Sequence, residues 1–255
     1  MLKGKTALIT GSTSGIGLAI AQGLADQGAN IVLNGLGDAG AIEAARSGIE
    51  GRGVKCVYDG ANLMDPAAIQ AMFGRIDPID ILVNNAGIQH VAAVQDFPDD
   101  KWNAIIALNL SAVFHCSKLA LPNMLAKGWG RVVNIASAHG LSASPYKSAY
   151  VAAKHGVVGF TKTLGLETAE KGITCNAVCP GYVLTPIVEG QIGDQMKVHG
   201  KNRDEVIRDI MLARQPTKKF VTVEEVAATT VFLCSPGAAS ITGTTISVDG
   251  GWTAL

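Results

Sequence analysis

Residues 5–17 read KTALITGSTSGIG, and this stretch says most about the fold. Its first six residues suit a buried strand, and the residues from Gly15 onward repeat apolar positions with the period of an amphipathic helix. Gly11, Gly15 and Gly17 lie at the junction in the spacing G-x-x-x-G-x-G. Glycines in such a turn let the backbone approach a pyrophosphate, and the helix start offers unpaired N–H groups. The stretch predicts a dinucleotide-binding turn that opens an α/β fold.

The same alternation of apolar runs and helix-period segments continues to the end of the chain. We expect strands at KTALIT, ANIVLNG, VKCVYDG, IDILVNN, GRVVNIAS, ITCNAVCPG and TTISVDGG, with helices between them. Strands that alternate with helices form right-handed crossovers and a parallel sheet covered on both faces. Residues 1–255 are therefore predicted to be a single doubly wound, Rossmann-type domain. Ligands bind such sheets beyond the carboxyl ends of the strands.

The composition limits the partners and the compartment. Lys+Arg and Asp+Glu both number 21, so the net charge is zero, which argues against nucleic acid or an anionic membrane as a partner. The five cysteines are dispersed without a C-x-x-C pair or metal-ligand spacing. No signal-peptide pattern and no apolar run of ~18–20 residues is evident. We expect a soluble cytoplasmic protein that holds no metal.

The end of the second expected strand bears on the choice of cofactor. A carboxylate there would bind the ribose 2′-hydroxyl of NAD, and an arginine would favour the 2′-phosphate of NADP. Asn34, Gly35 and Leu36 supply neither, and the turn at residues 12–14 has no basic side chain. Because a buried phosphate without a cation is costly, NAD is favoured by exclusion.

Ser137, Tyr150 and Lys154 are the candidates for proton chemistry. Tyr150 and Lys154 lie four residues apart at the start of a predicted helix, on one face, and Ser137 closes the strand before them. A phenol has a pKa near ~10, so it needs a neighbouring positive charge to act as a base at neutral pH. The lysine ammonium can supply that charge.

With TGSTSGIG, NNAG and Ser137…Tyr150-x-x-x-Lys154 in this order, the chain resembles the short-chain dehydrogenase/reductase family over its full length. The resemblance implies that Tyr150 is the general base, Ser137 binds the reacting oxygen, and Lys154 binds the nicotinamide ribose and lowers the tyrosine pKa. It also implies that Asn109 holds a water of a proton relay. The implied cofactor contacts are Gly11, Thr13, Ser14, Gly15, Ile16, Gly17, Leu36, Asn62, Leu63, Asn85, Ala86, Gly87, Tyr150, Lys154, Pro180, Gly181, Val183 and Thr185.

Four more polar residues come from the same loops: Gln89, His139, Lys147 and Gln191. A cation, an imidazole and two amides suit a small carboxylate better than a steroid or lipid alcohol. Within the family, the chain most resembles members that interconvert (R)-3-hydroxybutyrate and acetoacetate with NAD, a reaction of ketone-body metabolism. That resemblance implies that these four residues bind the substrate together with Ser137, Tyr150, Tyr182 and Trp252. It further implies a lid at about residues 187–214 and a homotetramer.

Three departures and two alternatives accompany this interpretation. Tyr182 replaces the usual tryptophan, Asn62 replaces an aspartate, and the segment before the fourth strand is a few residues short. One alternative is an NADPH-dependent 3-oxoacyl carrier-protein reductase or another short-chain alcohol dehydrogenase. The other is a non-catalytic NAD-binding regulator, which would be expected to lack part of the catalytic set.

Overall fold

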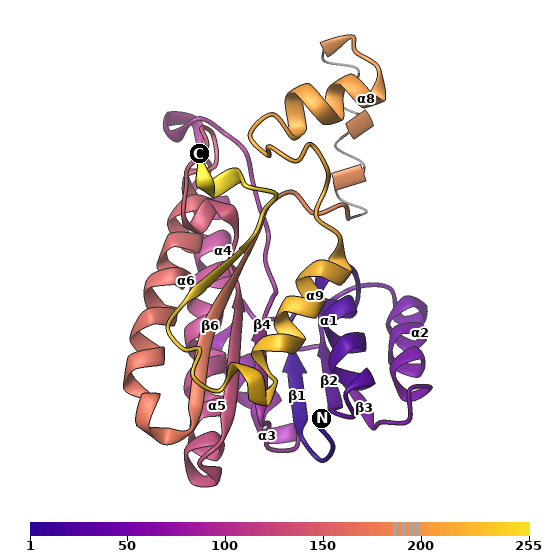
Figure 1. The fold of residues 1–255 in the computed structure, drawn as a ribbon, viewed down its shortest axis with the longest axis vertical. Coiled ribbons are helices and arrows are strands. Elements are labelled where there is room, and N and C mark those ends of the chain that lie inside the picture. Colours follow the sequence, from indigo (N-terminus) through magenta and orange to yellow (C-terminus); the bar gives the residue numbers. More distant parts are fainter. Residues whose placement is uncertain (186–187, 190–191, 194–195, 197–198) are drawn as a thin grey trace.

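The computed structural model describes residues 1–185, 188–189, 192–193, 196 and 199–255. Within these ranges a parallel sheet of seven strands runs in the order β3-β2-β1-β4-β5-β6-β7 (Figure 1). All seven predicted strands are confirmed. They are β1 Thr6–Ile9, β2 Asn30–Asn34, β3 Cys56–Asp59, β4 Ile81–Asn84, β5 Gly130–Ile135, β6 Ile173–Pro180 and β7 Thr245–Val248.

Helices cover both faces of the sheet, as predicted. One face carries α1, α2 and α9, and the other carries α3, α5 and α6 (Figure 1). The longer helices are α1 Gly15–Asp26, α2 Ala39–Glu50, α3 Pro66–Arg75, α4 Asp99–Ile106, α5 Ala112–Lys127, α6 Ser148–Glu167 and α9 Val223–Leu233. A short helix, α8 Arg203–Glu205, continues into the π-helical turn Val206–Met211 and projects beyond the body of the molecule.

Burial on both faces explains why the strands read as continuous apolar runs. In β1, Ala7 and Ile9 belong to one buried cluster, and Leu8 between them belongs to the cluster on the opposite face. Successive side chains of a strand point to opposite faces, so a sheet covered twice needs apolar residues at every position. The sheet is thereby fixed as the rigid centre of the molecule.

The helical segment Asp99–Lys127 has two notable features. Its α4 and α5 parts are joined by a π-helical turn, Ala107–Ser111, instead of forming one regular helix. By length and composition alone it could also span a membrane, since an 18-residue window within it has a mean hydropathy of 1.6. This is weak evidence for a membrane, because a core helix passes the same test. Here α5 packs against β4 and β5.

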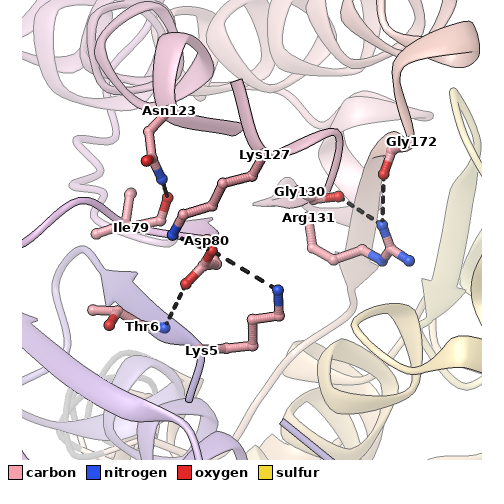
Figure 2. A network of polar contacts seen from close by, with 9 residues as sticks. All are labelled: Lys5, Thr6, Ile79, Asp80, Asn123, Lys127, Gly130, Arg131 and Gly172. Carbon is pink, nitrogen blue, oxygen red and sulfur yellow. Dashed lines mark hydrogen bonds and ion pairs between the residues drawn. The ribbon is translucent and has the colours of Figure 1, made fainter. Parts of the chain in front are cut away.

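Asp80 ties together the ends of several elements at the edge of the sheet where the strands begin (Figure 2). Its side chain is almost fully buried, and Oδ2 accepts a hydrogen bond of 3.0 Å from the backbone N–H of Thr6. Lys127 Nζ at the end of α5 lies 2.8 Å from Oδ1, and Lys5 Nζ lies 4.0 Å away. One carboxylate therefore joins β1 and α5 to the start of β4.

We predict that Asp80→Ala lowers the free energy of unfolding by about 2 kcal/mol, because the half-buried N–H of Thr6 loses its acceptor and two lysines lose their counter-ion. Urea unfolding of the isolated protein measures this. Asp77→Ala is the matched control, since Asp77 pairs with Lys55 on the exposed surface and its loss should leave the unfolding curve close to wild type. Equal stability of both variants would show that the Asp80 contacts do not stabilise the fold.

Candidate active site

The loops that follow β1, β4, β5 and β6 meet at one edge of the sheet, because all strands point the same way (Figure 1). They comprise residues 10–14, 85–93, 136–147 and 181–185. Most of the candidate residues from the sequence lie in or next to these loops. The edge is the one that a parallel sheet uses for ligands.

Hydrogen bonds lock the turn after β1 to the loop after β4. The Thr10 hydroxyl accepts from the backbone N–H groups of Asn85 (2.9 Å) and Ala86 (3.0 Å). In return, Asn85 Nδ2 donates to the carbonyls of Thr10 and Gly11, both at 2.9 Å. The amide predicted as a cofactor contact thus also holds two loops in register.

The glycines of the turn are required by its geometry. Gly11 and Gly15 have φ angles of +61° and +55°, in the left-handed region. Gly17 has no room for a side chain, since a Cβ there would collide with the Gly11 carbonyl and lie 2.6 Å from Nδ2 of Asn85. The turn therefore brings bare backbone to the surface of the groove beside it.

The start of α1 offers unpaired donors to that groove. Ser14 is the N-cap residue, yet its side chain makes no capping hydrogen bond, and the first turn carries no acidic residue. The first N–H groups of a helix then remain free, and the helix dipole favours an anion there. A dinucleotide pyrophosphate fits this arrangement.

A groove of about 480 Å³ lies over these elements, and none of the described residues that line it is charged. Asn34, at the end of β2, uses its amide to donate to the carbonyls of Asp59 (3.0 Å) and Ala61 (3.1 Å). The Asn62 amide oxygen accepts from the N–H of Met64 at 3.1 Å. Twelve of the predicted cofactor residues line the groove: Gly11, Ser14, Gly15, Ile16, Gly17, Leu36, Asn62, Leu63, Asn85, Ala86, Gly87 and Thr185.

Thr13 is the one predicted cofactor residue that lines neither this groove nor the cavity next to it. It lies at the rim, where a Cβ on Gly35 would be 2.9 Å from its hydroxyl.

A second cavity, of about 570 Å³, continues from the groove and shares five lining residues with it, among them Ile16 and Thr185. It brings together Ser137, Tyr150 and Lys154 with the remaining cofactor candidates and most of the substrate candidates. These further residues are Gln89, His139, Lys147, Pro180, Gly181, Tyr182, Val183 and Trp252.

Ser137, Tyr150 and Lys154 occupy the centre of this cavity. Lys154 is buried, and its ammonium donates to the Ile135 carbonyl at 2.7 Å and lies 5.6 Å from the centre of the Tyr150 ring. The Ser137 hydroxyl accepts from the backbone N–H of His139 at 3.1 Å, so its own proton stays available to another acceptor. The i, i+4 spacing in α6 places the phenol and the ammonium on one face, as predicted.

Burial controls the ionisation of the three titratable groups here. It lowers the pKa of Lys154 to about 8 and raises the pKa of Tyr150, an increase that the neighbouring Ser137 hydroxyl opposes. Burial also lowers the pKa of His139 to about 4, assisted by the positive charges of Lys147 and Arg214. At neutral pH, His139 is therefore a neutral imidazole. In the protein alone, burial outweighs the expected effect of Lys154 on the tyrosine.

Asn109 lies in the π-helical turn and is fully buried. Its side chain is committed to the loop after β4, since Oδ1 accepts from the N–H of Ile88 and Nδ2 donates to the Ile88 carbonyl, both at 2.9 Å. The side-chain amide that was predicted to hold a water thus already forms hydrogen bonds with the backbone of Ile88. A change from α- to π-helical bonding leaves one carbonyl without an intrahelical donor, so the main chain here can accept from a water.

Aromatic rings and Lys147 form the far wall of the cavity. Tyr182 stacks on Trp252 with ring centres 5.6 Å apart, and Trp252 meets the His139 ring edge-on at 5.0 Å. Lys147 Nζ donates to the Tyr182 hydroxyl at 3.4 Å. The tyrosine that replaces the expected tryptophan therefore adds a polar contact while it keeps the aromatic surface.

Gln191 and parts of the predicted lid lie outside the described residues. The described part of the lid has a small core of its own in which Ile192, Val206 and Met211 pack together against Tyr182. Glu189 and Arg203 pair across this segment, with Nη1 of the arginine 2.6 Å from a carboxylate oxygen. Val188 lines the cavity, so the segment reaches the site.

Sequence reasoning missed two residues beside this cavity, Ser144 and Arg214. Ser144 Oγ lies 3.0 Å from Nε2 of His139, and Arg214 contacts the loop that carries Ser144. No motif contains either residue, and 70 positions separate them. His90, which had no predicted role, also lines the cavity.

The chain is similar to known proteins over nearly its full length. A family model described as enoyl-(acyl carrier protein) reductase matches residues 11–253. The chain is 55% identical to D-beta-hydroxybutyrate dehydrogenase of Rhizobium meliloti (strain 1021), over 98% of this chain and 99% of the relative. It is 53% identical to the Cupriavidus necator protein of the same name, with both chains fully covered.

Among solved structures, the chain is similar to a variant of actinorhodin polyketide ketoreductase with NADPH. The TM-score is 0.91 at 36% sequence identity, with 98% of each chain covered. This similarity supports the Rossmann-type fold and the binding of a dinucleotide cofactor.

Proposed function

The chain belongs to the short-chain dehydrogenase/reductase family, and we propose that it interconverts (R)-3-hydroxybutyrate and acetoacetate with NAD as the hydride acceptor. The observation that carries this proposal is one cavity in which Ser137, Tyr150 and Lys154 face a polar set of His139, Lys147 and Gln89. The first set suits transfer of a hydroxyl proton. The second suits a small carboxylate. Relatives more than half identical bear the corresponding name.

In the proposed oxidation, Tyr150 takes the proton of the substrate hydroxyl while Ser137 donates a hydrogen bond to the reacting oxygen. NAD, when bound, accepts the hydride at the nicotinamide ring and brings a positive charge to the site. That charge and the Lys154 ammonium, 5.6 Å from the Tyr150 ring, both favour the phenolate. They offset the burial that raises the pKa of Tyr150 in the protein alone.

Lys154 has a second role in this proposal, which is to bind the nicotinamide ribose. Its ammonium is held in place by the Ile135 carbonyl, and three donors on one nitrogen leave others for a ribose hydroxyl and a water. A water on the backbone near Asn109 would link Lys154 to solvent, so that the proton taken by Tyr150 can leave the site.

The carboxylate of the substrate is proposed to lie against His139 and Lys147, with Gln89 and Gln191 as further donors. Lys147 supplies the charge, and the neutral His139 supplies one N–H donor. Tyr182 and Trp252, stacked on each other, offer an apolar surface to the methyl end. A four-carbon hydroxy acid therefore finds polar and apolar surfaces in this cavity, and the proposed preference for the (R) enantiomer rests on the resemblance to relatives that bear the D-beta name.

The preference for NAD rests on the groove that would hold the adenosine half of the cofactor. None of its described lining residues is charged, so nothing there would neutralise a 2′-phosphate. An NADPH-dependent carrier-protein reductase would need such a cation, and the intact set of Ser137, Tyr150 and Lys154 argues against a non-catalytic regulator.

We also propose a cytoplasmic homotetramer, a state that light scattering would measure as four times the mass of one chain. The five cysteines are free and buried, as a reducing compartment allows. Phe114 on α5 and Leu166 on α6 are 47% and 80% exposed, and a subunit interface over these helices would cover them. A monomeric mass in solution would refute this assembly.

The proposed function predicts rapid reduction of NAD with (R)-3-hydroxybutyrate and at least ~10-fold lower kcat/KM with the (S) enantiomer or with NADP. Steady-state absorbance assays with the four combinations measure this. Failure to turn over either enantiomer, together with efficient reduction of a 3-oxoacyl thioester, would refute the proposal in favour of the carrier-protein reductase.

Tyr150→Phe should reduce kcat by about 10³-fold or more, because the phenylalanine can neither accept nor return the proton. Tyr146→Phe is the control, since this exposed tyrosine lies four residues earlier and should retain wild-type kcat. If Tyr150→Phe keeps kcat near wild type, Tyr150 is not the general base.

Lys147→Ala and His139→Ala should each raise KM for (R)-3-hydroxybutyrate by roughly 10- to 100-fold while kcat changes much less, since charge-assisted hydrogen bonds to the carboxylate are lost. Lys55→Ala, which breaks only an exposed ion pair with Asp77, serves as the control. An unchanged KM in both cavity variants would mean that the carboxylate binds elsewhere.

A further inference from the structure

Arg214 lies just after the π-helical turn Val206–Met211, at the base of the predicted lid, and reaches across to the loop between β5 and α6. Nη1 donates to the Ala143 carbonyl at 2.6 Å and to Ser144 Oγ at 3.4 Å, and Nη2 donates to Ser142 Oγ at 3.4 Å. Three consecutive residues of one loop are thus held by one guanidinium. A planar fork of five donors is suited to such a contact, and a lysine is not.

This loop belongs to the segment that carries the proposed active-site groups. Ser137 and His139 precede it, and Lys147 and Tyr150 follow it. Its conformation therefore bears on how both the proton-transfer residues and the carboxylate-binding residues are placed. Arg214 also lies over Trp252, with 5.6 Å between the guanidinium carbon and the ring centre.

Ser144 connects Arg214 to His139. Its hydroxyl oxygen lies 3.0 Å from Nε2 of His139, and within the described part of the chain Nδ1, the other ring nitrogen, makes no hydrogen bond. An arginine can only donate, so Ser144 Oγ acts as an acceptor toward Arg214 and keeps its own proton. If that proton goes to Nε2, both links from the guanidinium to the ring have a donor and an acceptor, and the remaining ring proton on Nδ1 is left for a ligand.

We infer that Arg214 is a positioning residue: through Ser144 it holds the His139 imidazole in the tautomer whose proton is on Nδ1, where it can meet the substrate carboxylate. The identity of that carboxylate rests on the proposed function. The hydrogen-bonded chain itself is a property of the free protein. Arg214 touches neither the reacting carbon nor the cofactor groove, so its removal should affect substrate binding more than the chemical step.

The first test needs no substrate. Nitrogen-15 spectra of the histidine side chains, with His139 assigned through a His139→Gln variant, report which ring nitrogen carries the proton. We expect the Nδ1–H tautomer in the wild type and a mixture of both tautomers in Arg214→Met and Ser144→Ala. An Nε2–H tautomer in the wild type, or an unchanged Nδ1–H tautomer in both variants, would overturn the inference.

The second test is a double-mutant cycle on steady-state kinetics. Arg214→Met and Ser144→Ala should each raise KM for (R)-3-hydroxybutyrate about 5- to 10-fold, with kcat within about 2-fold of wild type. Because both act through one chain, the double variant should be no worse than the poorer single variant. Arg208→Met is the control: this exposed arginine lies in the preceding π-helical turn and pairs only loosely with Asp209, at 3.9 Å.

Multiplication of the two single effects in the double variant, or a wild-type KM in Arg214→Met, would overturn the role of Arg214. A wild-type enzyme that does not use 3-hydroxybutyrate would instead refute the proposed function. The tautomer measurement still decides the inference in that case.

Discussion

The contact between the turn after β1 and the loop after β4 is the constraint on which the site depends. These two strands are neighbours in the sheet, yet their following helices leave toward opposite faces, which opens a crevice at the edge. Reciprocal hydrogen bonds between Thr10 and Asn85 join the two loops at the base of that crevice. The glycine turn, the free start of α1 and the catalytic cavity all take their positions from this junction.

Burial then determines the chemistry that the assembled groups can perform. It lowers the pKa of Lys154 and His139 and raises that of Tyr150, so the protein alone holds a protonated tyrosine and a neutral imidazole. The electrostatics of the cavity therefore suit a ligand that carries charge. A carboxylate compensates Lys147, and an oxidised nicotinamide favours the phenolate. Each ligand would thus bring a charge that the protein alone lacks, negative beside Lys147 and positive beside Tyr150.

Local patterns in the sequence were sufficient for much of this architecture. The seven strands follow from apolar runs, and the shared face of Tyr150 and Lys154 follows from their spacing in a helix. Features that depend on how distant segments meet were not accessible in this way. The Asn109 side chain is occupied by Ile88, and the Arg214 guanidinium is fixed by residues 142–144. Neither partner is visible until the elements are placed. The direction of the Tyr150 pKa shift depends on burial for the same reason.

The central claim is that one cavity binds the substrate carboxylate through His139 and Lys147 and transfers the hydroxyl proton through Tyr150. A crystal structure of the complex with NAD and acetoacetate tests it most directly. The account predicts the carboxylate within hydrogen-bond distance of His139 Nδ1 and Lys147 Nζ, with the keto oxygen near the Tyr150 and Ser137 hydroxyls. A ligand bound in the reverse orientation, with its carboxylate beside Tyr150 and its methyl group beside Lys147, would contradict it.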